Sequence, residues 1–359
     1  MGIKKGLAFC VLLCSSFVLF HTVIYGQEAL SYRQALALAQ ENENALAVRS
    51  VDAQIAAVRD ELNELMEMLQ ESSWSNWPDN LRNVYQRQIT ELERQILFLQ
   101  LNRDITMVGI ERSLRGALVN DRVTANNIAI AEERLTLSEE RLRRTVILRR
   151  FGLASANDLY AAEQGLSQQR MELEHLRVTA SNQRQALNLL LHQPLNREIE
   201  ITFETGSSDL PEDLERYISA AVPQAPSIRQ LQINIDRRRD ERELYSATHG
   251  DDARQETLTA LTGAHNRAVR ERDNAVCAME AAIRASYNGI IQLRAQKDAA
   301  VSELERAMHE WETAQRQFQL GRVTQFEVDN ARFVILSREL ALQNITYQLW
   351  LAEFSLFNP

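Results

Sequence analysis

The chain has 359 residues, of which 45% are hydrophobic and 25% are charged, and it contains only 12 glycines and 6 prolines. So few helix-interrupting residues in so long a chain predict long helices and argue against a fold of many strands. The net charge of −9 and the pI near 5.4 argue against a nucleic-acid partner, which would require a basic surface.

Residues 1–26 have the pattern of a secretory signal peptide. Lys4 and Lys5 supply the positive start, Leu7 to Phe20 form the apolar segment, and Gly26 precedes the expected cleavage point. The chain is therefore expected to be exported. An uncleaved membrane anchor is the alternative, although the apolar run is short for a membrane span.

Helical spacing of apolar residues then predicts a helix over Leu30 to Leu69, which Ser31 can cap. The polar break Glu71–Pro78 separates it from a second helical pattern over Asp79 to Arg150. At 1.5 Å per residue that second helix would be about 105 Å long. A helix of this length cannot bury its apolar stripe in one compact globule, so it needs a coiled-coil-like partner.

A turn at Gly152 follows, and a helix is expected over Ala156 to Leu191, where Pro194 ends the pattern. The stretch REIEITFET, residues 197–205, alternates apolar and polar side chains, as a short half-buried strand does. A short helix is expected over Leu214 to Val222.

The same plan then restarts in the second part of the chain. Helices are expected over Ser227 to Leu244, Gln255 to Phe318 and Gln325 to Phe357, with a break at Ala247–Arg254 and a turn at Gly321. The basic run Arg237–Arg239 is flanked by carboxylates and is interpreted as a solvated, ion-paired helix face.

The second part is an echo of the first at a shift of 169 residues (321 − 152), which superposes the two turn glycines. The same shift superposes like residues beyond the turn: Thr324 on Ser155, Glu327 on Asp158 and Val328 on Leu159. This indicates duplication of a whole half. The predicted organisation is a signal peptide (1–26), a first repeat (27–196), a connecting equatorial segment (197–226) and a second repeat (227–359).

Each turn carries the chemistry of a tight helical hairpin. A glycine after a helix C-terminus adopts the left-handed conformation without steric cost. A hydroxyl three positions later, followed after two residues by a carboxylate, gives a capping box for the next helix. The residues concerned are Gly152, Ser155 and Asp158 in the first turn, and Gly321, Thr324 and Glu327 in the second.

The pattern Gly-x-x-Ser/Thr-x-x-Asp/Glu-Leu/Val, present twice in tandem halves behind a secretory signal, resembles the TolC-type outer-membrane efflux protein family. The segment Leu30–Leu62 also resembles that family's N-terminal helix: Asn44 matches, while Ala45 replaces a proline. The resemblance covers nearly all of residues 30–357. It implies an all-α fold of long antiparallel, coiled-coil-like hairpins, a duplicated helical barrel with at most a short equatorial strand.

The resemblance further implies a homotrimer that forms a hollow α-helical tunnel across the periplasm. The hairpin tips would dock a periplasmic adaptor protein that works with an inner-membrane transporter. Carried onto this sequence, the docking residues are Gly152, Leu153, Ser155, Gly321, Val323 and Thr324. The alternative is that these residues only close the hairpins.

The chain departs from the family where membrane strands would be inserted between the second and third helices of each half. The breaks Glu71–Pro78 and Ala247–Arg254 have eight residues each, whereas one membrane strand needs about 9–11. A reduced member without those strands is therefore expected, with Ile96–Leu101 helical rather than extended. Trp74 and Trp77 in the first break are candidates for a membrane interface, or they pack over a helix turn.

No catalytic or cofactor pattern emerges, so no enzyme, cofactor or metal site is expected. The six histidines, at 21, 175, 192, 249, 265 and 309, show no metal-binding spacing. Cys277, the single cysteine beyond the signal, lies in an apolar helical stripe and is expected to be a buried, inert thiol.

The leading functional prediction is a component of a cell-envelope efflux or type I secretion system. The alternative is a periplasmic coiled-coil scaffold or interaction protein that has lost channel activity. An adaptor-like hairpin protein is a third class, against which the two hairpins and the lack of glycine-rich strands argue.

Overall fold

The computed structural model describes residues 28–41, 43–71, 77–206, 208–249 and 254–359. In chain order the elements are β1 (Glu28–Ser31), α2 (Tyr32–Glu41), α3 (Glu43–Glu71), α4 (Asp79–Arg150), α5 (Ala156–Leu190), β2 (Ile199–Thr202), α6 (Leu214–Ala221), the 3-10 turn η2 (Val222–Gln224), α7 (Pro226–His249), α8 (Gln255–Gln319) and α9 (Gln325–Phe357). The all-α prediction is confirmed.

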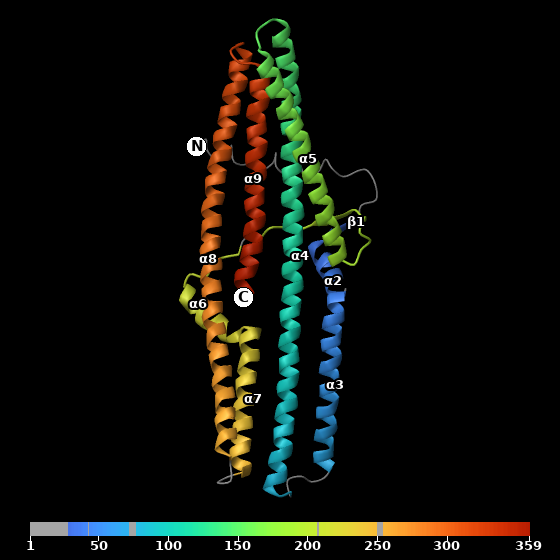
Figure 1. Ribbon diagram of the computed structural model, residues 1–359, viewed down its shortest axis with the longest axis vertical. Coiled ribbons are helices and arrows are strands. Elements are labelled where there is room, and N and C mark those ends of the chain that lie inside the picture. The colour runs from blue at the N-terminus through green and yellow to red at the C-terminus, as the bar shows by residue number, and fades with distance from the viewer. Residues whose placement is uncertain (1–27, 42, 72–76, 207, 250–253) are drawn as a thin grey trace, which may run out of the picture.

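Two long helices run the full height of the molecule and organise the others (Figure 1). α4 has 72 residues and α8 has 65. α4 packs against α5 toward one end and α3 toward the other, and α8 packs in the same way against α9 and α7. α4 also contacts α9 and α7, so it joins the two halves into one wall.

Most helix bounds follow the sequence pattern closely, although the single helix predicted over Leu30 to Leu69 is two helices, α2 and α3. α4 begins and ends at the predicted residues, and Ile96–Leu101 are helical within it. α7 is longer than predicted, because polar residues continue the helix to His249. Residues 1–27, 72–76 and 250–253 lie outside the described part, so the signal peptide, Trp74, most of the first break and half of the second stay predictions.

A small parallel sheet marks the equator of the molecule. β2 is the predicted strand, and it pairs in parallel with β1, with Glu28 opposite Ile199 and Leu30 opposite Ile201. Placing Leu30 in a helix was therefore wrong, because the four residues of β1 take their conformation from this partner. Ser31 still caps α2: its hydroxyl accepts from the backbone N–H of Gln34 at 3.4 Å.

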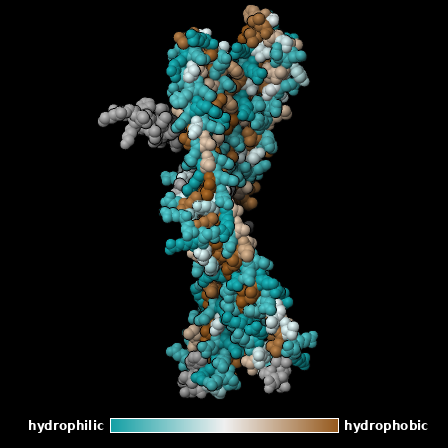
Figure 2. Space-filling model, turned by 90° about the vertical axis from the view of Figure 1, so that its left-hand side faces the viewer, coloured by the Kyte–Doolittle hydropathy of each residue, from teal (hydrophilic) through white to brown (hydrophobic). Residues whose placement is uncertain are grey.

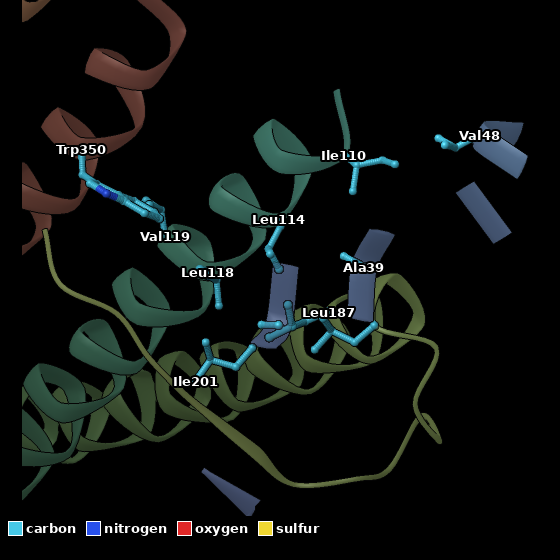
Figure 3. Close-up of a cluster of buried hydrophobic side chains, with 11 residues drawn as sticks. Ala39, Val48, Ile110, Leu114, Leu118, Val119, Leu187, Ile201 and Trp350 are labelled. Carbon is cyan, nitrogen blue, oxygen red and sulfur yellow. The ribbon is translucent and has the colours of Figure 1, made fainter. Parts of the chain in front are cut away.

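The equatorial core gathers side chains from almost the whole length of the chain (Figure 3). α4 supplies a stripe at helical spacing, Ile110, Leu114 and Leu118, all at most 4% exposed. α9 supplies Trp350, which lies against Val119. The remaining buried members are Ala35, Ala39, Val48, Leu187, Leu191 and Ile201.

Cys277 is exposed, so its prediction as a buried thiol was wrong. Its neighbours Val276 and Met279 pack toward a core cluster of α6, α7, α8 and α9. Cys277 points away from that face of the helix, because successive residues of an α-helix are about 100° apart. Within the described residues no helix is long and apolar enough to span a membrane.

Candidate docking site at the hairpin tips

The turn between α4 and α5 is closed by a glycine in the left-handed region. Gly152 has φ 72°. Its N–H donates to the carbonyl of Arg149 at 3.0 Å, and the N–H of Leu153 donates to the carbonyl of Leu148 at 2.8 Å. This is the Schellman arrangement, which satisfies two carbonyls at the end of α4.

The turn between α8 and α9 repeats this geometry. Gly321 has φ 67°. Its N–H donates to the backbone carbonyl of Phe318 at 2.8 Å, and the N–H of Arg322 donates to the backbone carbonyl of Gln317 at 2.9 Å. The two turns are therefore copies of one structure, 169 residues (321 − 152) apart in the chain.

A capping box starts the helix after each turn. In the first, the Asp158 carboxylate accepts from the N–H of Ser155 at 2.7 Å, and the Ser155 hydroxyl accepts from the N–H of Asp158 at 3.1 Å. In the second, the Glu327 carboxylate accepts from the N–H and the hydroxyl of Thr324 at 2.7 and 2.9 Å. Both boxes supply partners to N–H groups that the helix itself leaves without one.

These hydrogen bonds also stabilise the charged carboxylates. The hydroxyl and N–H of Ser155 hold the pKa of Asp158 below its usual value. The N–H and hydroxyl of Thr324 lower the pKa of Glu327, with a further contribution from the positive charge of Arg144. A negative charge here also suits the positive end of the helix dipole.

The two turns lie at the same end of the molecule (Figure 1). Of the six residues predicted for docking, five are exposed and Val323 is half-buried. The structure adds large apolar side chains that the sequence prediction missed: Phe151 (76% exposed) and Leu320 (67%), beside Leu153 (75%). Phe151 and Leu320 immediately precede the turn glycines, which was the available signal.

Apolar side chains this exposed are unusual when they gather at one end of a molecule. Basic residues accompany them, since Arg149 and Arg150 occupy the last turn of α4. The tips therefore present exposed apolar side chains next to basic residues and to the cap carboxylates, on a pair of capped turns.

Trp77, the described member of the predicted membrane-interface pair, is half-buried at the opposite end. Its ring lies 5.4 Å from that of Tyr85 in an edge contact, within a cluster formed by α3 and α4. Within the described ranges, no group of three or more His, Cys, Asp or Glu residues is placed to hold a metal ion.

Comparison with solved structures identifies the fold. A search of protein-family models and of curated proteins found no match. Among solved structures, the outer membrane protein VceC of Vibrio cholerae matches with a TM-score of 0.68 at 12% identity, over 91% of this chain and 95% of that one.

Two further channels match in the same way. The MtrE outer membrane channel of Neisseria gonorrhoeae has a TM-score of 0.63 at 12% identity, over 90% of this chain and 87% of its own. The CmeC outer membrane channel of Campylobacter jejuni has a TM-score of 0.62 at 13% identity, over 76% and 67%. The chain thus has the fold of the TolC-type outer-membrane channels.

Proposed function

We propose that this chain, which has the fold of TolC-type outer-membrane channels, is the conduit component of a cell-envelope efflux or type I secretion system. Three copies form an α-helical tunnel across the periplasm. The tips dock a periplasmic adaptor, which connects the tunnel to an inner-membrane transporter. The role is transport, not catalysis.

One observation carries this proposal: both copies of the capped turn lie at one end and expose apolar residues there. Hairpins could be closed by glycine and the capping boxes alone. The side chains of Phe151, Leu153 and Leu320 contribute nothing to those caps, yet they are 67–76% exposed to solvent. A docking partner that covers these side chains accounts for their exposure.

Assembly of several copies is supported by the edges of the wall. On α5, Tyr160, Met171 and Val178 are 58–64% exposed, and their spacing places them on one helix face. α8 exposes Ile291 and Val301, and Figure 2 shows hydrophobic side chains along this side between hydrophilic flanks. One copy is an open wall (Figure 1), so a closed tunnel needs further copies that cover these edges.

Photo-crosslinking in the producing cell tests the docking role. A photoreactive amino acid at Leu153 or Leu320 is expected to capture a periplasmic adaptor encoded beside a transporter. The same residue at Leu195, an apolar loop position 52% exposed near the equator, is the matched control and should capture none. Equal capture at all three positions, or none at the tips, would contradict tip docking.

Light scattering of the purified full-length chain tests the conduit itself. Trimers are expected, and a Met171→Asp change on the α5 face should weaken them. Finding only monomers or dimers would instead favour the periplasmic scaffold.

A further inference from the structure

Away from the tips, each half of the chain has an apolar cluster of its own. One cluster there joins α3 to α4 through Val58, Leu65, Leu69 and Leu92. The other joins α7 and α8 to α6 and the end of α9. Among the described residues, no core cluster contains side chains from both α4 and α7, although the two helices are in contact.

The contact between α4 and α7 is made instead by a reciprocal pair of ion pairs. Glu91 of α4 binds Arg237 of α7, and Arg94 of α4 binds Asp240 of α7, each with a nitrogen–oxygen distance of 2.7 Å. Burial raises the pKa of the Asp240 carboxyl, but hydrogen bonds from Arg94 and Arg239 outweigh this effect and hold the pKa below its usual value. The four side chains in the two pairs are 21–48% exposed, so dissolved salt reaches them.

Open grooves surround these ion pairs. A groove of about 680 Å³ lies between the helices, lined by residues from Asn83 to Arg94 of α4 and from Asn234 to Leu244 of α7. A second groove of about 510 Å³ shares Asn234 and Arg237 with it and reaches Phe98. There the side-chain amide of Gln230 donates to the carbonyl of Phe98 at 3.3 Å. Close packing, which resists movement in a protein interior, is therefore lacking along this contact.

At the equator the same two halves are joined by apolar packing. Trp350 of α9 lies in the core against Val119 of α4 (Figure 3). Its ring stacks on Phe203, with centroids 5.0 Å apart, and the Arg115 guanidinium lies 4.4 Å from the ring centroid. Salt does not weaken such packing as it weakens exposed ion pairs.

We propose that the α4–α7 contact is a salt-sensitive seam, at which the two halves part by pivoting about the Trp350 contact. Glu91 lies 28 positions before Val119, so the seam is about 40 Å from this pivot at 1.5 Å per residue. A small rotation at Trp350 therefore opens the seam widely and widens that end of the wall without unfolding a helix.

Pulsed electron paramagnetic resonance on the full chain measures this opening. Spin labels at Gln88 on α4 and Glu243 on α7 span the seam, and labels at Asn120 on α4 and Gln348 on α9 span the equator as a reference. All four sites are exposed. The three native cysteines are replaced by serine, and labelled chain is diluted with unlabelled chain so that only distances within one chain are seen.

Raising NaCl from about 0.05 to about 1 M, where the Debye length is about 3 Å, should lengthen and broaden the seam distance and leave the reference unchanged. The Glu91→Arg variant should show the open distance already at low salt. The double change Glu91→Arg with Arg237→Glu recreates the ion pair in reverse, and it should restore both the closed distance and its salt response.

A seam distance that ignores both salt and Glu91→Arg would overturn the proposal. A reference distance that changes together with the seam would overturn it as well, since it would mean general loosening. Retained helical circular dichroism shows that each variant has folded. None of these readings depends on transport or on trimer formation, so failure of the seam and failure of the proposed function can be told apart.

Discussion

Arg144, near the end of α4, donates a hydrogen bond to the hydroxyl of Thr324, the residue that caps α9, over 3.4 Å. Its guanidinium also lies 6.0 Å from the ring centroid of Phe326. One side chain of the first half thus contacts the cap of the second half. The two turns are thereby connected at their common end, and the apolar residues around them can form one surface.

Replacing the turn glycines should destabilise the hairpins. Gly152 and Gly321 have φ values of 72° and 67°, where a β-carbon costs about 1–2 kcal/mol. Gly152→Ala and Gly321→Ala should each lower the urea midpoint of unfolding accordingly. Gly116→Ala is the matched control: this glycine lies within α4, and an added β-carbon meets nothing within 4 Å. It should leave stability unchanged or raise it by up to about 1 kcal/mol. Equal losses in all three would contradict the argument.

The capping boxes should loosen in acid. The pKa values of Asp158 and Glu327 are lower in the folded chain than their ordinary values of 3.8 and 4.5. Their contribution to stability is therefore complete above those ordinary values and is lost as the pH falls through the lower, folded pKa values.

Hydrogen exchange at the start of α5 and α9 should accordingly accelerate below about pH 4, beyond the normal pH dependence of exchange. Asp158→Asn should remove this effect at α5 and leave it at α9. Identical profiles for the two helices in that variant would show that the box is not the cause.

Arg294 and Glu353 form an ion pair, and replacing Arg294 should destabilise the fold more than replacing Glu353. Glu353 is 5% exposed in its side chain, and its oxygens accept from Arg294 and from the N–H of Ser208, each at 2.9 Å. Arg294 is 36% exposed. Arg294→Met leaves a buried carboxylate without its cation and should lower the free energy of unfolding by about 3 kcal/mol.

Glu353→Gln leaves a partly solvated arginine without its carboxylate and should lower the free energy of unfolding by about 1–2 kcal/mol. Unfolding in urea compares the two variants. The reverse order would mean that the arginine, not the carboxylate, is the desolvated member.

Tyr32 should titrate well above the ordinary pKa of a tyrosine. Burial, with the hydrogen bond to Glu111, raises its pKa from 10.0 to about 12. Because the folded pKa is the higher one, the stability that it adds is complete below about pH 10 and is lost as the pH rises through about 12. Tyrosinate absorbance should show one late step that Tyr32→Phe removes. If the step remains in that variant, another tyrosine is responsible.

The sequence was sufficient to predict the elements whose signals are local. Helices as long as α4 carry their period over many turns, and the glycine, hydroxyl and carboxylate of each turn lie within seven consecutive residues. The docking role assigned to these turns stays a prediction, because local pattern defines their shape and not their partner.

Features that depend on partners far away in the chain could not be predicted from the sequence. β1 is extended because β2 lies beside it, and nothing within Glu28–Ser31 indicates that partner. Arg237 was expected on a solvated, ion-paired helix face; it is ion-paired, but its partner Glu91 lies on another helix, which the sequence did not indicate. The exposure of Phe151 and Cys277 depends likewise on which neighbours fold over them, and periodicity alone does not reveal this.

The equatorial core limits the order in which the molecule can assemble, because its members come from distant parts of the chain. Each hairpin closes between neighbouring segments, so α4 with α5 and α8 with α9 can form early. The equatorial core combines Ala35 with Trp350, so it cannot be completed before nearly the entire chain is available. Contacts between such distant positions form slowly, because a long loop must close first. We therefore expect the middle of the molecule to become ordered last, although the described part of the chain begins there.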